Sequence, residues 1–217
     1  MIDGIQIKVC GLTSLVDAQA ADIAGVDYLG FNFYPKSPRH VSPEAFKAMA
    51  KGLPRRKKVA VAVEPTADEL LALRAMKFDY FQVHFRHDIG NHVIKAWSAA
   101  VGPGSLWLAP KLPPEVDVPT LWLALANAVL LDTFDRTLYG GTGRTGDWPK
   151  FKRHQDGHPA TTWILSGGLS PGNVGDALRG TGARFLDVNS GVESKPGVKD
   201  LGKLKAFGEA IHASAQG

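Results

Sequence analysis

The chain has 217 residues, of which 44% are hydrophobic and 21% charged, so it can bury a sizeable core and lacks the composition of a disordered chain. Its 25 Lys and Arg and 21 Asp and Glu give a formal net charge of +4, and their even spread predicts a solvated surface rather than a nucleic-acid-binding face. The single cysteine excludes an intramolecular disulfide and a multi-cysteine zinc site, and no apolar stretch reaches the ~20 residues that cross a bilayer.

Short apolar runs rich in β-branched or aromatic residues recur along the chain, with helix-like segments between them. This alternation is typical of βα units on a parallel sheet. Most runs are continuous rather than alternating, as strands covered on both faces should be. In chain order we predict eight strands, at residues 5–9, 28–33, 58–63, 80–83, 106–109, 128–131, 162–165 and 185–188.

Helix-start signals fall between these runs. Thr66 with Glu69 forms a capping box, while Ser42-Pro43 and Ser170-Pro171 each place a capping side chain before a proline. Five of the fourteen prolines lie in residues 103–119, which predicts a rigid loop with little room for a regular fifth helix.

Eight βα units can form either a closed barrel or an open doubly wound sheet. No glycine-rich dinucleotide turn follows the first predicted strand, which disfavours the open sheet. We therefore expect a single (β/α)8 (TIM) barrel domain of parallel strands over residues 1–217.

The residues that close the predicted strands are unusually polar. In a parallel barrel the catalytic face lies at these carboxyl ends. A thiol, an arginine, a histidine and a carboxylate would meet there, supplied by Cys10, Arg39, His84 and Asp132. Each has a structural alternative as a buried small residue, a surface charge, a satisfied core histidine or a turn cap, but their coincidence favours a site.

Three glycine-rich loops add to this face. Gly167-Gly168 and Ser190-Gly191 follow the seventh and eighth strands, where barrels often bind a phosphate through backbone N–H groups. A third loop at residues 139–145 contains Gly141 and Arg144 but lacks the Lys-Ser/Thr ending of a nucleotide-binding loop. We expect a phosphate site at the first two loops and a lid at the third.

Several motifs resemble the phosphoribosylanthranilate isomerase family, and they cover essentially the whole chain in order. They are Lys8-Val9-Cys10-Gly11-Leu12-Thr13, Gly30-Phe31-Asn32-Phe33 with Ser37-Pro38-Arg39, Leu131-Asp132-Thr133 with Gly140-Gly141-Thr142-Gly143-Arg144-Thr145, Ser166-Gly167-Gly168-Leu169 and Asp187-Val188-Asn189-Ser190-Gly191-Val192-Glu193.

The resemblance implies an Amadori rearrangement of N-(5-phosphoribosyl)anthranilate in tryptophan biosynthesis, by general acid–base catalysis without metal or cofactor. It implies Cys10 as general base and Asp132 as general acid. It also implies Arg39 as the partner of the anthranilate carboxylate and Asp187 as a residue near the sugar. The turns at Gly167-Gly168 and Ser190-Gly191 would hold the phosphate, and His84, Gly141 and Arg144 are further candidates.

Three positions depart from the family pattern, namely Phe85, Gly146 and Asn189, and the first two bear on the shape of the mouth and the lid. The implied chemistry is also demanding, because ordinary pKa values of about 3.9 for Asp and about 8.5 for Cys favour the opposite protonation states. The site must therefore shift both values.

Rival interpretations are another phosphosugar barrel, such as a pentose-phosphate epimerase or indole-glycerol-phosphate synthase, and a non-catalytic phospholigand-binding barrel. The synthase would require strand-end lysines, whereas Lys8 lies inside the first strand and Lys111 in a loop. We expect a small phosphosugar as partner, with no nucleic acid and no membrane, and either a monomer or a homodimer. Since Met1 to Gly4 begin no basic and apolar leader, we expect a cytoplasmic protein.

Overall fold

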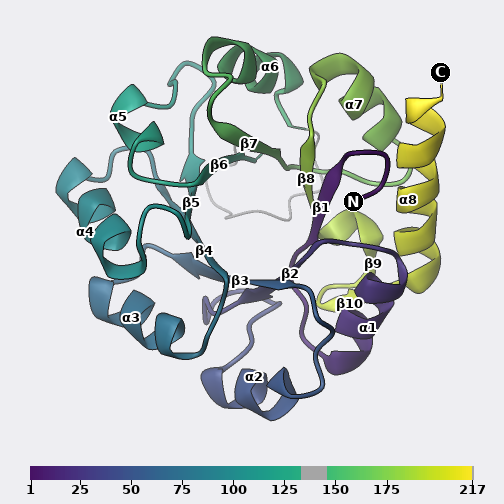
Figure 1. Ribbon diagram of the computed structural model, residues 1–217, viewed down its shortest axis with the longest axis horizontal. Helices are drawn as coiled ribbons and strands as arrows, with labels where there is room; N and C mark the ends of the chain where they lie inside the picture. Colours follow the sequence, from purple (N-terminus) through teal and green to yellow (C-terminus); the bar gives the residue numbers. More distant parts are fainter. Residues whose placement is uncertain (133–145, 217) are drawn as a thin grey trace.

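The computed structural model describes residues 1–132 and 146–216, in which eight parallel strands form a closed ring in chain order, with β8 pairing back onto β1 (Figure 1). This confirms the expected (β/α)8 barrel. The strands are β1 Gln6–Val9, β2 Tyr28–Asn32, β3 Lys57–Val63, β4 Tyr80–Arg86, β5 Leu106–Lys111, β6 Ala128–Leu131, β7 Thr162–Leu165 and β8 Phe185–Val188.

Helices surround the ring, as Figure 1 shows. They are α1 Leu15–Ile23, α2 Pro43–Ala50, α3 Ala67–Ala75, α4 Asn91–Val101, α5 Thr120–Leu123, α6 Trp148–Gly157, α7 Val174–Thr181 and α8 Leu201–Ala215. Between β8 and α8 the chain adds a short 3-10 helix, η1 Ser190–Val192, and an antiparallel hairpin of β9 Glu193–Lys195 and β10 Val198–Lys199.

The barrel has two hydrophobic layers because successive side chains of a strand point to opposite faces. The outer layer packs the strands against the helices, and a smaller inner cluster fills the ring. Within the inner cluster the ring of Tyr28 lies 4.8 Å from that of Phe185 and 5.4 Å from that of Trp107. The interior is therefore a packed core, and ligand chemistry is confined to its ends.

Two of the three predicted helix starts are confirmed. The side chain of Ser42 accepts the N–H of Ala45, and Thr66 and Glu69 form both bonds of the capping box. The start predicted at Ser170-Pro171 is wrong, because α7 begins at Val174. Asn173 accepts the N–H of Ser170 at 2.8 Å and donates to the carbonyl of Gly168 at 2.9 Å, which fixes residues 171–173 as a turn.

The centre of the chain differs from expectation in strand length. β4 and β5 extend to Arg86 and Lys111, and Phe85 pairs with Pro110 in the sheet. The proline had suggested an earlier end, but it costs only one ladder hydrogen bond. α5 has four residues, which confirms that the proline-rich segment leaves little room for a helix.

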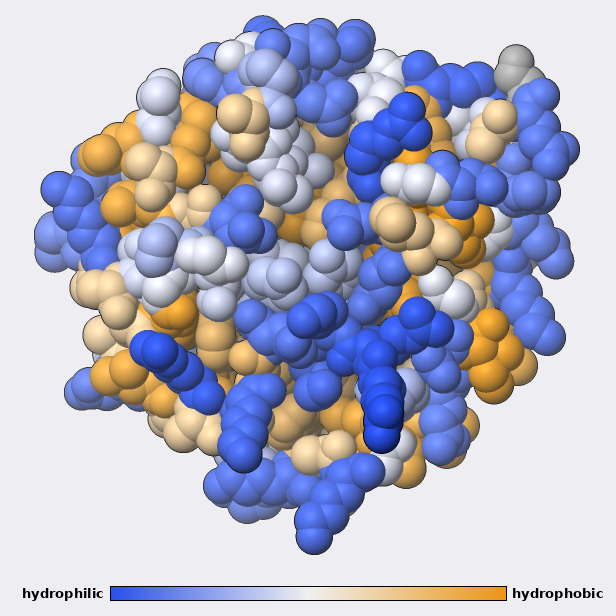
Figure 2. Space-filling model, in the orientation of Figure 1, coloured by the Kyte–Doolittle hydropathy of each residue, from blue (hydrophilic) through white to orange (hydrophobic). Residues whose placement is uncertain are grey.

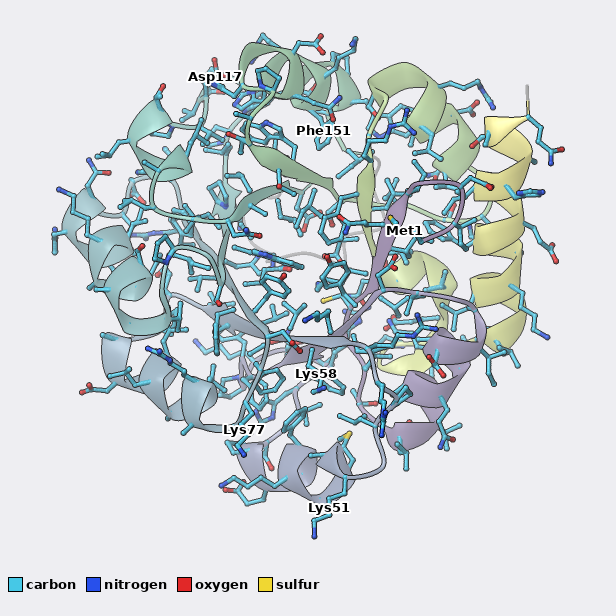
Figure 3. The ribbon with its side chains drawn as sticks, in the orientation of Figure 1. Met1, Lys51, Lys58, Lys77, Asp117 and Phe151 are labelled. Carbon is cyan, nitrogen blue, oxygen red and sulfur yellow. The ribbon has the colours of Figure 1, made fainter. Side chains whose placement is uncertain are left out.

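We call the end of the barrel at the carboxyl ends of the strands its mouth. The opposite end carries the residues that follow helices and begin strands. Lys51, Lys58 and Lys77, labelled in Figure 3, belong to this end, and so does the basic run at residues 55–58. Hydrophilic residues gather over α8 and α2 in the space-filling view (Figure 2). Within residues 1–132 and 146–216, no helix has both the length and the apolar character to span a membrane.

Candidate active site

The mouth of the barrel collects residues from the carboxyl ends of nearly all its strands. Cys10 directly follows β1 and is 6% exposed, and its backbone N–H donates to the carbonyl of Val188 at 2.9 Å. Asp132 directly follows β6, three strands away around the ring. The order of the strands thus places the thiol and this carboxylate at the same end of the barrel.

One small pocket at this end joins several of the predicted residues. Its lining comprises Asp132, Ser166, Gly167, Gly168, Leu169, Asp187, Asn189 and Ser190. Gly167 and Gly168 have φ of 94° and 60°, a region that glycine adopts without strain. Asp132 at the end of β6 and the turns after β7 and β8 therefore open into one space.

Gly191 lies against the neighbouring turn rather than opening into that pocket. A Cβ atom at this position would lie 1.9 Å from the carbonyl oxygen of Leu169. Only glycine permits this approach, so Gly191 sets the distance between the turns that follow β7 and β8.

Inside the ring, two residues before Cys10, lies a buried ion pair between β1 and β8 that sequence reasoning did not find. Lys8 Nζ contacts Asp187 Oδ1 at 3.0 Å, and the two side chains are 0% and 5% exposed. Burial alone would lower the pKa of Lys8, but Asp187 and Cys10 together raise it above its ordinary value. Burial raises the pKa of Asp187, against the pull of Lys8. The only signal in the sequence was a lysine between the apolar residues Ile7 and Val9 of the strand.

A second buried charge cluster holds Arg39. Its Nε and Nη2 donate to Glu193 Oε1 and Oε2 at 2.8 and 2.7 Å, and Lys199 Nζ contacts the same carboxylate at 2.8 Å. The hydrogen bonds to Glu193 raise the pKa of Arg39, and although burial works to raise the pKa of Glu193, Arg39 and Lys199 hold it below its ordinary value. A ligand carboxylate would therefore have to approach the other edge of the guanidinium.

Gly11 and Asn189 connect this cluster to the end of β1. Gly11 has a φ of 71°, and a Cβ there would lie 2.5 Å from Arg39 Cδ and 2.7 Å from Asn189 Oδ1. Asn189 Oδ1 also accepts a hydrogen bond from Lys199 Nζ at 2.9 Å. Asn189, a departure from the family pattern, thus binds a structural lysine.

His84 lies on β4, and its Nε2 is 2.8 Å from Gln82 Nε2. Burial, and secondarily the charge of Lys8, lowers the pKa of His84 to about 3. The imidazole is therefore neutral near pH 7 and does not serve there as a cationic partner of phosphate. The adjacent Phe85 points away from the mouth, with its ring 5.3 Å from Trp97 and 5.2 Å from Trp122.

The glycine-rich loop with Gly141 and Arg144 lies outside the described residues. Gly146, just after it, donates its N–H to the carbonyl of Gly167 at 3.2 Å and lines a second pocket with Asp132 and Lys150. In the parts of the chain that the structure describes, no three His, Cys, Asp or Glu residues gather as metal ligands could.

A closed parallel barrel with reactive side chains and glycine turns at the carboxyl ends of its strands defines a (β/α)8-barrel enzyme. The model of the family described as N-(5'phosphoribosyl)anthranilate (PRA) isomerase matches residues 7–210. The chain therefore belongs to the phosphoribosylanthranilate isomerase family, and its function is that of this isomerase of tryptophan biosynthesis.

Individual relatives agree with the family match. The N-(5'-phosphoribosyl)anthranilate isomerase of Aquifex aeolicus is 36% identical over 94% of this chain and 96% of its own length. That of Magnetococcus marinus is also 36% identical, over 98% of both chains. The crystal structure of phosphoribosyl anthranilate isomerase from Thermus thermophilus has a TM-score of 0.79 at 28% identity, covering 96% of this chain and 99% of that one.

Proposed function

We propose that Cys10 and Asp132 carry the acid–base chemistry of the isomerisation, with the substrate held between Arg39 and the turns after β7 and β8. The main support for this proposal is a single pocket lined by Asp132, by both turns and by Asp187. Through its ion pair with Lys8, Asp187 connects this pocket to the strand that bears Cys10. The proposed acid, base and phosphate grip thus adjoin one another.

The proposed steps conserve atoms and charge. Protonated Asp132 donates to the ring oxygen of the phosphoribosyl group, and the ribose opens to an iminium at C1. The Cys10 thiolate removes the proton from C2, and the electron pair moves toward the iminium nitrogen. The resulting enolamine becomes the ketone when its C2 hydroxyl loses a proton and C1 gains one.

The proposed phosphate grip uses backbone groups. Within the described residues, the N–H groups of Gly167, Gly168 and Ser190 donate no hydrogen bond to protein. Such N–H groups at a barrel mouth suit an anion. One solved relative, 27% identical with a TM-score of 0.74, was crystallised with reduced 1-(o-carboxyphenylamino)-1-deoxyribulose 5-phosphate, which supports a phosphosugar as the ligand class.

The same proposal covers the setting of the enzyme. We place it in the cytoplasm, as a monomer or homodimer that requires no metal or cofactor and binds no nucleic acid. A solved relative from Thermotoga maritima, 29% identical, is a dimeric phosphoribosylanthranilate isomerase from which monomers have been generated, so both states are accessible in the family.

Turnover of freshly prepared phosphoribosylanthranilate, followed by the loss of its fluorescence, tests these roles. Cys10→Ser and Asp132→Asn should each lower kcat by about 10²–10⁴, the usual contribution of a general acid or base, with KM little changed. Asp156→Asn is the matched control, because Asp156 is an exposed residue on α6 that pairs with Lys152. Near-normal kcat in either site variant would remove that residue from the mechanism.

A further inference from the structure

We propose that Lys8 is a positioning residue that favours ionisation of the Cys10 thiol, so that the thiolate can form for proton abstraction. This inference rests on the proposed role of Cys10 as general base. It adds to the site a residue that touches no substrate and acts only through the thiol.

The geometry follows from the strand. Lys8 lies on β1 and Cys10 two positions further on, directly after the strand, so both side chains leave the same face, toward the interior, where Cys10 belongs to the inner cluster. Lys8 acts on the pKa of Cys10 through its charge. A Cβ at Gly30 would lie 2.9 Å from Lys8 Cε and 3.1 Å from Cys10 Cα, so the glycine of β2 makes the space that both residues occupy.

The charges around Cys10 favour its anionic form. Lys8 pairs with Asp187 from β8, while Arg39 and Lys199 share Glu193 from β9. Three cations are thus joined by side-chain ion pairs to two carboxylates, and all five are buried. A buried charge is costly unless it is paired, and a thiolate at Cys10 would supply the missing negative charge.

Among the groups that act on Cys10, Lys8 favours the thiolate most strongly. Burial keeps the pKa of the Cys10 thiol above its ordinary value, while Lys8 is the strongest influence that lowers it, followed by Lys199. Asp187 raises the pKa of Cys10, and the charge of Arg39 also interacts with that of Cys10. Removing Lys8 should therefore raise the pKa of Cys10 further, because the weaker effect of Lys199 would then oppose burial, whereas neutralising Asp187 should lower it.

The alternative is that Lys8 serves only as a counterion that lets Asp187 be buried. Both roles predict loss of activity on mutation, so activity alone cannot separate them. The titration of Cys10 separates the two roles. If Lys8 served only as a counterion for Asp187, replacing Lys8 and replacing Asp187 would have no reason to shift the pKa of Cys10 in opposite directions.

Cys10 is the only cysteine, so thiolate ultraviolet absorbance and iodoacetamide alkylation both report on it alone, with Cys10→Ser as the blank. Relative to the intact chain, Lys8→Met should raise the midpoint of the Cys10 titration by about one to three pH units, the usual effect of losing an adjacent opposite charge. Asp187→Asn should lower it. The acid limb of kcat/KM should move in the same direction as the thiol in each variant.

Lys150→Met is the matched control. Lys150 is also a buried lysine, 6% exposed, but its ammonium donates to the carbonyls of Pro113 and Val116 at 2.6 Å each. Removing it should leave the Cys10 midpoint where the intact chain has it, which separates the loss of any buried ammonium from the loss of this one.

An unchanged or lowered midpoint in Lys8→Met overturns the inference. If Lys8→Met does not fold, Asp187→Asn decides alone, and an unchanged or raised midpoint there overturns it. The absorbance and alkylation readouts need no substrate. If the intact chain failed to turn over phosphoribosylanthranilate while both shifts of the Cys10 midpoint were observed, the proposed catalytic roles would be refuted. The electrostatic action of Lys8 on Cys10 would still stand.

Discussion

Arg39 binds Glu193, and we propose that the same guanidinium has the second task of binding the substrate carboxylate. Its Nε–Nη2 edge is bound to Glu193, and the side chain of Arg39 is only 10% exposed. Truncating it would leave Glu193 with Lys199 as its remaining ion-pair partner among the described residues. A fall in activity on mutation would therefore mix lost substrate binding with lost structure.

Comparison of two substrates separates these tasks. Arg39→Ala should reduce kcat/KM for phosphoribosylanthranilate by about 2–5 kcal/mol in transition-state stabilisation, as expected for a buried charge pair. An aniline analogue without the carboxylate should be much poorer than the natural substrate in the intact enzyme and nearly equal to it in the variant. Arg56→Ala, at a half-buried pair with Asp22, should change kcat/KM by less than about 1 kcal/mol. If the preference for the carboxylate survives in Arg39→Ala, another group binds it.

For single residues, the sequence identifies those at the ends of strands more readily than the side chains to which they bind. Cys10 and Asp132 were predicted because a parallel barrel brings strand ends together, and the structure places both at the mouth. Glu193 was not predicted to bind Arg39, because the two lie 154 residues apart and a surface charge was an equally good interpretation of either. Lys8 was set aside as strand interior, since its partner Asp187 is 179 residues away.

The elements that shape the proposed phosphate site are two turns, each of which constrains the other. The glycines predicted turns after these two strands. The predicted start of α7 was wrong, because Asn173 forms a turn before the helix. Likewise Pro110 did not end β5, since the strand continues there by pairing with β4 and the proline removes only one ladder hydrogen bond. Local signals thus located the elements, while tertiary contacts set their boundaries.

Gly191→Ala tests the contact between the turns. The added methyl would displace the carbonyl of Leu169, so the variant should lose about 1–3 kcal/mol of stability, as overpacked sites do. It should also raise KM and weaken competitive inhibition by inorganic phosphate, because the turns would separate. Gly104→Ala is the control, since a Cβ there meets nothing within 4 Å. Unaltered phosphate inhibition in Gly191→Ala would show that the grip lies elsewhere.

For the whole molecule, the half-buried His84 of β4 makes stability depend on pH. Because the pKa of His84 falls from 6.5 to about 3 on folding, the unfolded chain binds a proton that the folded chain does not. Well above pH 6.5, His84 is neutral in both states and does not change the free energy of unfolding. As the pH falls from 6.5 toward 3, His84 lowers the free energy of unfolding by a growing amount. The slope should reach at most about 1.4 kcal/mol per pH unit.

Urea unfolding at several pH values between 4 and 8 measures this dependence. The free energy of unfolding should fall below about pH 6 in the intact chain, and His84→Gln should reduce that slope. Equal slopes in the intact chain and His84→Gln would mean that other groups set the acid limit.

The closure of the barrel between β1 and β8 also has a consequence for protein synthesis. Lys8 and Cys10 are synthesised well before their partners, because Asp187 follows Lys8 by 179 residues and Glu193 follows Arg39 by 154. At about 5–20 residues per second, the thiol waits on the order of ten seconds or more for these partners. A nascent chain therefore carries its reactive thiol without the surroundings that tune it, and a translation product that stops before β8 has a cysteine but no assembled catalytic centre.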